Sequence, residues 1–502
     1  MEQNSYERPI DAVSTKQSVD ETLRETFLIA LKGLSGLDPQ EKEWCIEKVR
    51  DARDAVRSAI EGDDRFLASE AVRVISHLAS ADNYSLEEPG KNEFSSLGLS
   101  FFQEFQEDIE KILEKGWVKA EDVLDSYYRM ADIGDTVQSI AGLTGLVQHF
   151  DLIRKGFSEK REHFKEIRYL RKILQLGSHE KAQNAVNCLL DIANTKIDEE
   201  EFPALISMLC GNSEYKSEGI TPIKHFLEKH NLPFAEIYSA WQESFTHGNV
   251  KNSDDPSLPE PFGQSIYSNI RNIQILEKAN RGICRFLWDE FQIADFGRYP
   301  PELLLKQREN FRSLENPYGL VIFPRNDWNG SFYSDKAALE GMFAQLKGEF
   351  DIRVFECEGK VDVVRALRKC DDMYNPPNGG GHKISLLILG GHGTENSVRF
   401  GGNDKRHVLY TEDLARKVSG KAGGYLDENP TIILASCSTG AEGGIAQELS
   451  KRFGAKVVAP QKPSSIVDLH ASKNRGGKFR FNASYTEKGV KNVYMQGAPV
   501  KK

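Results

Sequence analysis

The chain has 502 residues, more than a single hydrophobic core usually spans, so its length predicts a multidomain protein. Hydrophobic residues make up 39% and charged residues 28%, as in globular chains, and a mean hydropathy of -0.49 without a long apolar run excludes a membrane-spanning helix. The net charge of -10 argues against a nucleic-acid-binding protein, so we expect protein partners.

The N-terminal 30 residues are polar and acidic, without the basic start and apolar middle of a signal peptide. We expect a flexible terminus over residues 1–18. The seven cysteines form no CxxC pair, and their odd number fits reduced thiols better than a disulfide framework or a zinc site. These features predict a cytoplasmic protein with neither a metal nor another cofactor.

Helical spacing of apolar residues runs through most of residues 19–247, for example in FLASEAVRVISHLAS and HEKAQNAVNCLLDIAN. This pattern predicts an all-α half, which we interpret as an interaction or regulatory domain for a protein partner. No motif returns at a fixed period, so a solenoid and a non-repeating bundle both stay open. Residues 248–316 begin with a stretch rich in Asn, Asp, Ser, Pro and Gly, and we expect a linker followed by connecting helices.

From residue 317 the pattern changes to short apolar runs that alternate with helical segments. Such alternation predicts an α/β domain over 317–502 with a mostly parallel sheet. The expected strands are 318–323, 351–357, 384–391, 431–436 and 455–460, and the expected helices are 334–350, 361–370, 411–420 and 443–453.

The C-terminal 32 residues carry eight Lys or Arg and one Glu, but apolar and polar residues alternate through KFRFNASYTEKGVKNVYMQG. This alternation favours a pair of surface strands over a nucleic-acid-binding patch.

Two of the predicted strands end in sequences that suit catalysis, LILGG-His392-Gly393-Thr394 and TIILAS-Cys437-Ser438-Thr439. Because the carboxyl ends of parallel strands share one edge, His392 and Cys437 meet if their strands are neighbours. A thiol that attacks an amide needs an imidazole to take its proton and to protonate the leaving amine. The backbone N–H groups of Gly393 and Cys437 are candidate oxyanion donors, and the helix after Cys437 adds a dipole that favours a thiolate.

Each motif alone has a simpler interpretation, since a cysteine after a strand is often a core residue and GGHG is often a turn. Their joint placement at two strand ends favours catalysis. A phosphatase-type site would need an arginine six residues after the cysteine, where Gly443 stands, and a hydrolase elbow would need glycine where Thr439 stands. His470, the one histidine after Cys437, leaves a downstream base open.

The segments LILGGHGT and ILASCSTG resemble the histidine and cysteine motifs of clan CD cysteine peptidases, which include caspases, gingipains, separase and CHAT domains; ASCSTG is most similar to the CHAT version. The stretch 321–357 also resembles the beginning of a caspase-like domain. The resemblance covers about a third of the chain, roughly 317–485. It implies a His-Cys dyad and hydrolysis of peptide bonds through a thioester.

The same resemblance implies a pocket beside the dyad that selects the substrate residue before the scissile bond (P1). Ala435 stands where caspases have a pocket glutamine and metacaspases an acid. In the loop after the first strand, Arg325 would select an acidic P1 residue and Asp327 a basic one; we favour Asp327. The sequence therefore predicts a cysteine endopeptidase with a protein substrate. The alternative is a helical interaction scaffold with an inactive peptidase-like domain.

Overall fold

The computed structural model divides the chain into two compact units, Met1–Leu189 and Leu190–Lys502. It describes residues 10–32, 39–80, 93–133, 136–159, 164–174, 180–195, 197–211, 215–243, 261–312, 315–325, 336–346, 348–375, 381–402, 404–415, 421–486 and 490–500. In these parts of the chain we find no helix that is both long enough and apolar enough to cross a membrane.

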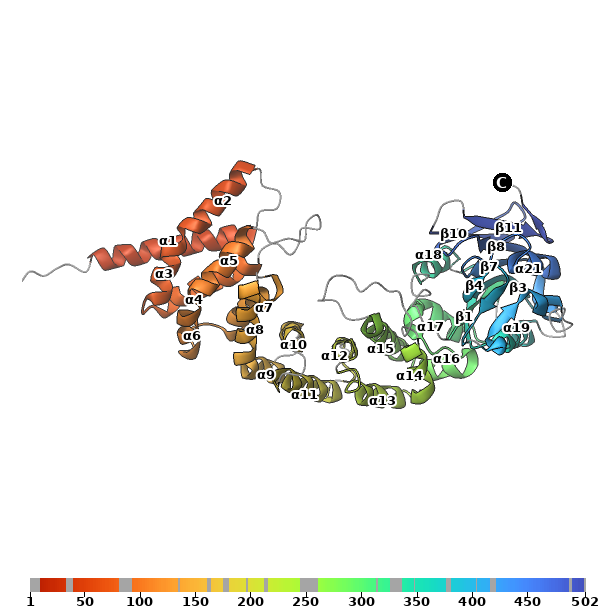
Figure 1. The fold of residues 1–502 in the computed structure, drawn as a ribbon, viewed down its shortest axis with the longest axis horizontal. Coiled ribbons are helices and arrows are strands. Elements are labelled where there is room, and N and C mark those ends of the chain that lie inside the picture. Colours follow the sequence, from red (N-terminus) through yellow and green to blue (C-terminus); the bar gives the residue numbers. More distant parts are fainter. Residues whose placement is uncertain are drawn as a thin grey trace, which may run out of the picture. The chain divides into compact units, whose positions relative to one another are not determined.

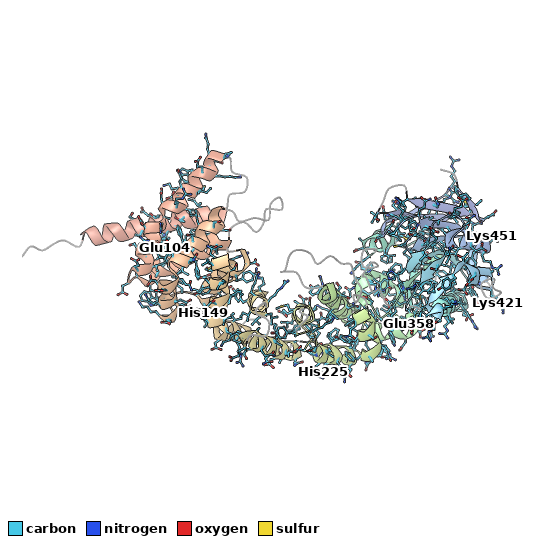
Figure 2. The ribbon with its side chains drawn as sticks, viewed as in Figure 1. Glu104, His149, His225, Glu358, Lys421 and Lys451 are labelled. Atoms are coloured by element: carbon cyan, nitrogen blue, oxygen red, sulfur yellow. The ribbon has the colours of Figure 1, made fainter. Side chains whose placement is uncertain are left out.

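The described part of the first unit is helical, as the sequence predicts (Figure 1). In α4, for example, the buried residues recur at helical spacing, and the Asp64 carboxylate accepts the N–H groups of Phe66 and Leu67 at the helix start. Glu104, labelled in Figure 2, forms ion pairs with Arg53 and Arg57. The helices are α1 (Ile10–Lys32), α2 (Pro39–Asp51), α3 (Arg53–Glu61), α4 (Arg65–Ser80), α5 (Glu93–Glu104), α6 (Gln106–Glu114), α7 (Ala120–Ile133), α8 (Thr136–Gln148), α9 (Phe150–Glu159) and α10 (Phe164–Leu174).

Helices also form the first part of the second unit. α11 (Glu180–Thr195) crosses the division between the units, and α12 (Phe202–Cys210), α13 (Ile220–Lys229), α14 (Phe234–Glu243), α15 (Pro261–Ala279), α16 (Ile283–Phe291), η1 (Phe296–Arg298) and α17 (Pro301–Glu309) follow. The fully buried Trp241 of α14 donates its indole N–H to the carbonyl of Ala294 at 2.8 Å. This bond ties α14 to the segment that leads into the sheet region.

A seven-stranded sheet forms the centre of the C-terminal region, in the order β12-β11-β8-β7-β3-β1-β2. In this sheet β8, β7, β3, β1 and β2 are parallel to one another, and β11 and β12 add an antiparallel edge. β1 is buried along its whole length, as expected for an apolar strand covered on both faces. The strands are β1 (Tyr318–Pro324), β2 (Asp351–Cys357), β3 (Ile384–Gly390), β7 (Leu426–Ala435), β8 (Lys456–Pro460), β11 (Lys491–Met495) and β12 (Ala498–Pro499). The predicted division into a helical half and a C-terminal sheet region is confirmed.

The connecting helices α18 (Lys336–Leu346), α19 (Lys360–Tyr374) and α21 (Ile445–Phe453) lie close to their expected positions. Two small sheets accompany them, one of β4 (His392–Thr394), β5 (Ser397–Arg399) and β6 (Val408–Tyr410), the other of β9 (Ile466–Lys473) and β10 (Phe479–Tyr485). Within the range 411–420, where a helix is predicted, residues 411–415 form the 3-10 turn η4 (Thr411–Ala415), and residues 416–420 lie outside the described part of the chain. Two further such turns are η3 (Lys405–His407) and η5 (Gly423–Tyr425).

The predicted pairing of the two C-terminal strands is wrong. β10 pairs with β9, and β11 instead extends the large sheet beside β8. The alternation of apolar and polar residues determines which face of a strand is buried, but it does not determine which strand it pairs with. The partner strand β9 lies in a stretch that contains Pro, Ser and Gly and therefore resembles a loop in sequence. The buried Tyr485 hydroxyl fastens β10 to the large sheet through the carbonyls of Leu434 and Val458.

The helices before the sheet belong to the same compact unit as the sheet, so the observed division after Leu189 differs from the predicted domain ends at 247 and 316. Gln307 of α17 shows why. Its fully buried amide bonds the N–H of Val354 at 2.8 Å and the C=O of the same residue at 3.0 Å. Because β2 is the last strand of the sheet, α17 covers an edge that would otherwise stay unpaired.

Candidate active site

The two sequence-predicted catalytic residues follow adjacent parallel strands at equivalent positions. β3 pairs with β7 up to the register pair Gly390 and Ala435. His392 stands two residues beyond Gly390, and Cys437 stands two residues beyond Ala435. The structure therefore places both residues just beyond the paired ends of two neighbouring strands, at the carboxyl edge of the sheet.

Polar contacts join the two strand ends just before the candidate residues. The N–H of Gly391 donates to the carbonyl of Ala435 at 3.2 Å, and the Ser436 hydroxyl donates to the carbonyl of Gly391 at 2.7 Å. Ser436 is only 3% exposed, so this bond is shielded from water. The residue before Cys437 thus fixes the residue before His392.

Gly393 lies against the backbone of Cys437. A methyl group added to Gly393 would stand 2.3 Å from the Cys437 carbonyl oxygen and 2.4 Å from the Ser436 hydroxyl oxygen. Such distances leave no room for a side chain. The missing side chain lets the two strand ends approach each other.

His392 begins β4 and pairs with Arg399 of β5 in the small sheet. Burial, followed by the positive charges of Arg399 and Arg298, lowers the pKa of the His392 imidazole from 6.5 to about 4. Its Nε2 atom is buried. At neutral pH the imidazole is therefore uncharged and can accept a proton.

Cys437 differs from the other cysteines by its exposure. It is partly exposed, whereas Cys45, Cys188, Cys210, Cys284, Cys357 and Cys370 are buried. Burial raises the pKa of the thiols of Cys210 and Cys370 to about 12 and those of Cys284 and Cys357 well above the usual value. Because it is the most accessible of the seven thiols, we expect thiol reagents to modify Cys437 first.

The turn after Cys437 is bent and is hydrogen-bonded to β8. Ser438 has a left-handed backbone with φ of 58°, which is uncommon for a residue with a side chain. The N–H of Gly440 donates to the carbonyl of Pro460 at 2.7 Å, which ties the turn to β8. The cysteine thus stands on a bent, fixed connection between β7 and α21.

The start of α21 contacts the histidine hairpin rather than offering free donors. The N–H of Ile445 donates to the carbonyl of Glu395 at 2.8 Å, and that of Ala446 donates to the carbonyl of Thr439 at 3.3 Å. Glu395 lies in the turn between β4 and β5, so α21 braces the hairpin that carries His392. The expected stabilisation of a thiolate by this helix has to act through the dipole alone, because these first donors are engaged.

The three pocket candidates have different surroundings. The Arg325 guanidinium pairs with Glu358, bonds Gln292 at 3.0 Å and lies 5.0 Å from the ring centre of Trp288. Ala435, at the end of β7, is only 6% exposed. Asp327 lies outside the described residues.

The alternative base His470 lies on β9, where its ring contacts Asp468 and Ser484. Ser436 and Arg399 were not among the predicted site residues. The hydroxyl pattern SCST at a strand end is the signal that points to Ser436, whereas Arg399 acts through a pairing that only the fold creates. Among the described residues, no group of three His, Cys, Asp or Glu side chains is placed to hold a metal ion.

The fold and the site define an α/β unit with a histidine and a cysteine at the carboxyl edge of its sheet. The model of a family described as a domain of unknown function (DUF8616) matches residues 368–476, a stretch that contains both His392 and Cys437. No curated protein matches the chain.

Proposed function

We propose that the chain is a cysteine endopeptidase of the caspase-like type, with Cys437 as nucleophile and His392 as general acid and base. The observation that supports this best is the equivalent placement of both residues beyond the Gly390–Ala435 pair, joined by the Ser436 hydroxyl. A buried core cysteine would not need a partly exposed position at that edge.

The neutral state of His392 suits the first step. The imidazole takes the proton of the Cys437 thiol while sulfur bonds to the substrate carbonyl carbon, and the N–H groups of Gly393 and Cys437 are the proposed donors to the oxyanion. Collapse of the tetrahedral intermediate breaks the C–N bond, and the imidazolium gives its proton to the leaving amine. Water then hydrolyses the thioester with His392 again as base.

The surroundings of Arg325 support a basic rather than an acidic P1 residue. Its charge is already paired with Glu358, so it offers little attraction to an acidic substrate side chain. Asp327 then becomes the candidate residue for selecting lysine or arginine. We also propose that the helical unit of residues 1–189 binds a partner or substrate protein. The support for this part of the proposal is the size of that unit.

Cleavage of a positional-scanning fluorogenic peptide library by the full chain tests the proposal, with the Cys437→Ala variant beside it. Cys357→Ala is the matched control, because Cys357 also ends a strand at the carboxyl edge but is only 1% exposed. We expect cleavage that is lost in Cys437→Ala and retained in Cys357→Ala.

Labelling with a peptide warhead separates the proposal from an inactive scaffold. If a generic thiol reagent modifies Cys437 but no peptide warhead reacts and no library member is cleaved, the site is a retained fold without peptidase activity. A preference for an acidic P1 residue would instead contradict the assignment of Asp327 to the P1 pocket.

A further inference from the structure

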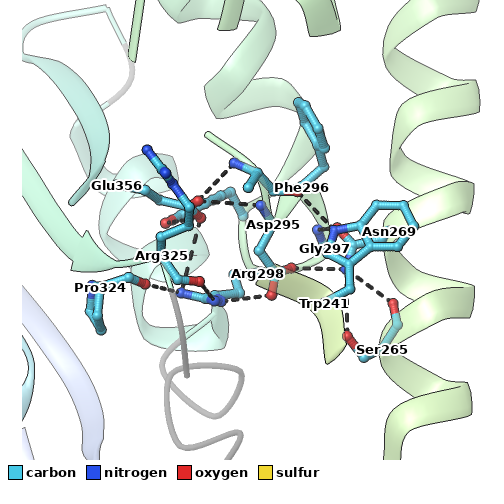
Figure 3. A network of polar contacts seen from close by, with 12 residues as sticks. Trp241, Ser265, Asn269, Asp295, Phe296, Gly297, Arg298, Pro324, Arg325 and Glu356 are labelled. Atoms are coloured by element: carbon cyan, nitrogen blue, oxygen red, sulfur yellow. Dashed lines mark hydrogen bonds and ion pairs between the residues drawn. The ribbon is translucent and has the colours of Figure 1, made fainter. Parts of the chain in front are cut away.

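A fully buried cluster of charges joins the helical segment 261–310 to the carboxyl ends of β1 and β2 (Figure 3). Asp295 and Arg298 are 0% exposed and Glu356 is 2% exposed. The Arg298 Nε atom lies 2.9 Å from the Asp295 Oδ2 atom, and its Nη1 atom lies 4.0 Å from the Glu356 Oε1 atom. Because taking charges out of water is costly unless they are well paired, the remaining contacts of this cluster show what it holds.

Both carboxylates are fixed from the helical side. Glu356 Oε2 accepts the backbone N–H groups of Ala294 at 2.7 Å and Asp295 at 3.3 Å, and its Oε1 accepts the Tyr299 hydroxyl at 3.0 Å. The Asn269 side chain of α15 donates to Asp295 Oδ1 at 3.0 Å. The carboxylate of Asp295 therefore has a set position, which in turn directs the guanidinium of Arg298.

The guanidinium holds the end of β1. Its Nη1 atom donates to the carbonyl of Pro324 at 2.5 Å, and its Nη2 atom donates to the carbonyl of Arg325 at 2.6 Å. β1 pairs with β3 only as far as Ile322 and Leu389. The last residues of β1 therefore pair with β2 on one side but no longer pair with β3 on the other. Arg298 holds them instead.

This end of β1 borders the candidate site. In the strand order, the connection after β1 runs toward β2, whereas the connection after β3 runs the opposite way toward β7. Open α/β sheets bind ligands at such a reversal. His392 stands three residues beyond Leu389. The positive charge of Arg298 also contributes to lowering the pKa of His392, after burial and the charge of Arg399.

We propose that Arg298 is a positioning residue for the candidate active site: from the helical segment it fixes the carboxyl end of β1 beside His392, and so sets one wall of the substrate crevice. The inference rests on the proposed function. The planar guanidinium bonds two successive carbonyls and a carboxylate from three different nitrogens, whereas the donors of lysine all sit on one nitrogen and cannot reproduce this geometry.

The test compares Arg298→Lys with Arg353→Lys in the full chain. Arg353 is the matched control because it is also 0% exposed and also bonds a backbone carbonyl, that of Asn310 at 2.6 Å, but it lies in the first half of β2. We expect Arg298→Lys to lose about tenfold or more in kcat with little change in KM. Arg353→Lys should lower the unfolding temperature but leave kcat close to that of the unchanged chain.

Equal losses of kcat in both variants, or an unchanged kcat in Arg298→Lys, would overturn the inference. A second measurement is independent of catalysis, namely NMR titration of His392, assigned by comparison with His392→Asn. In the Asp295→Asn/Arg298→Gln double variant, which removes the ion-paired charges of Asp295 and Arg298 together, the His392 midpoint should rise, whereas Arg353→Lys should leave it in place. If the unchanged chain cleaves no peptide, the proposed function fails, and this titration alone decides: an unmoved midpoint refutes the placement of Arg298 beside His392.

Discussion

Replacing Gly393 with alanine should damage both the stability and the activity of the chain. The added methyl group would stand 2.3 Å from the Cys437 carbonyl oxygen and 2.4 Å from the Ser436 hydroxyl oxygen, and ordinary contacts begin near 3.4 Å. One of the two strand ends must therefore move by about 1 Å. Overpacking of this kind costs about 1–3 kcal/mol in free energy of unfolding, and a shift of that size at reacting groups lowers the rate about 100-fold.

Gly402 provides the matched control, because it belongs to the turn between β5 and β6 and an added methyl group there meets nothing within 4 Å. Gly402→Ala should stay within about 0.5 kcal/mol of the unchanged chain. Urea unfolding and kcat/KM on the best library peptide measure both effects. A Gly393→Ala variant that matches Gly402→Ala in both measurements would show that the strand ends are not in contact.

Three further predictions concern the site and the buried cluster. Because folding lowers the pKa of His392 from 6.5 to about 4, the acid limb of the kcat/KM profile should lie near pH 4. For the same reason the wild type should lose stability as the pH falls from 6.5 to 4, and thermal unfolding should show that His392→Asn does not lose it. Ser436→Ala should lose about 1 kcal/mol and most of kcat, whereas Ser450→Ala, which loses an equally buried 2.8 Å bond on α21, should lose stability only. Burial and the charge of Asp295 raise the pKa of Glu356 from 4.5 to about 7, so wild-type stability should fall as the pH rises from 4.5 to 7, and Glu356→Gln should flatten that decline in urea titrations.

The strands that carry the candidate site could be predicted because each is a short apolar run buried on both faces. The segments 318–323, 351–357, 384–391 and 455–460 fall within one residue of β1, β2, β3 and β8. Since parallel strands end at one edge, the positions of His392 and Cys437 in the sequence were enough to expect them at that edge. Their closeness, however, depends on β3 and β7 being neighbours, which periodicity does not determine.

The missed features depend on partners that are far apart in the sequence. The Ser436 hydroxyl reaches Gly391, 45 residues earlier, and the pairing of Arg399 with His392 needs the hairpin of β4 and β5. β9 was missed because its residues alternate weakly within QKPSSIVDLHASKNRGG, a composition typical of loops.

Arg298 shows why the domain boundary could not be read from the sequence. In FGRYPP two prolines shortly after the arginine are typical of an exposed connection, and arginine is seldom fully buried. Its burial depends on two residues that are distant in the sequence. Glu356, which follows β1 in the chain, lies beside its guanidinium, and Asn269 holds the carboxylate of Asp295 that pairs with it. Removing the helices before 296 would delete Asn269 and the cover over this cluster and leave buried charges partly unpaired. A functional α/β unit should therefore include α15, and with Trp241 bonded to Ala294 it should include α14 as well.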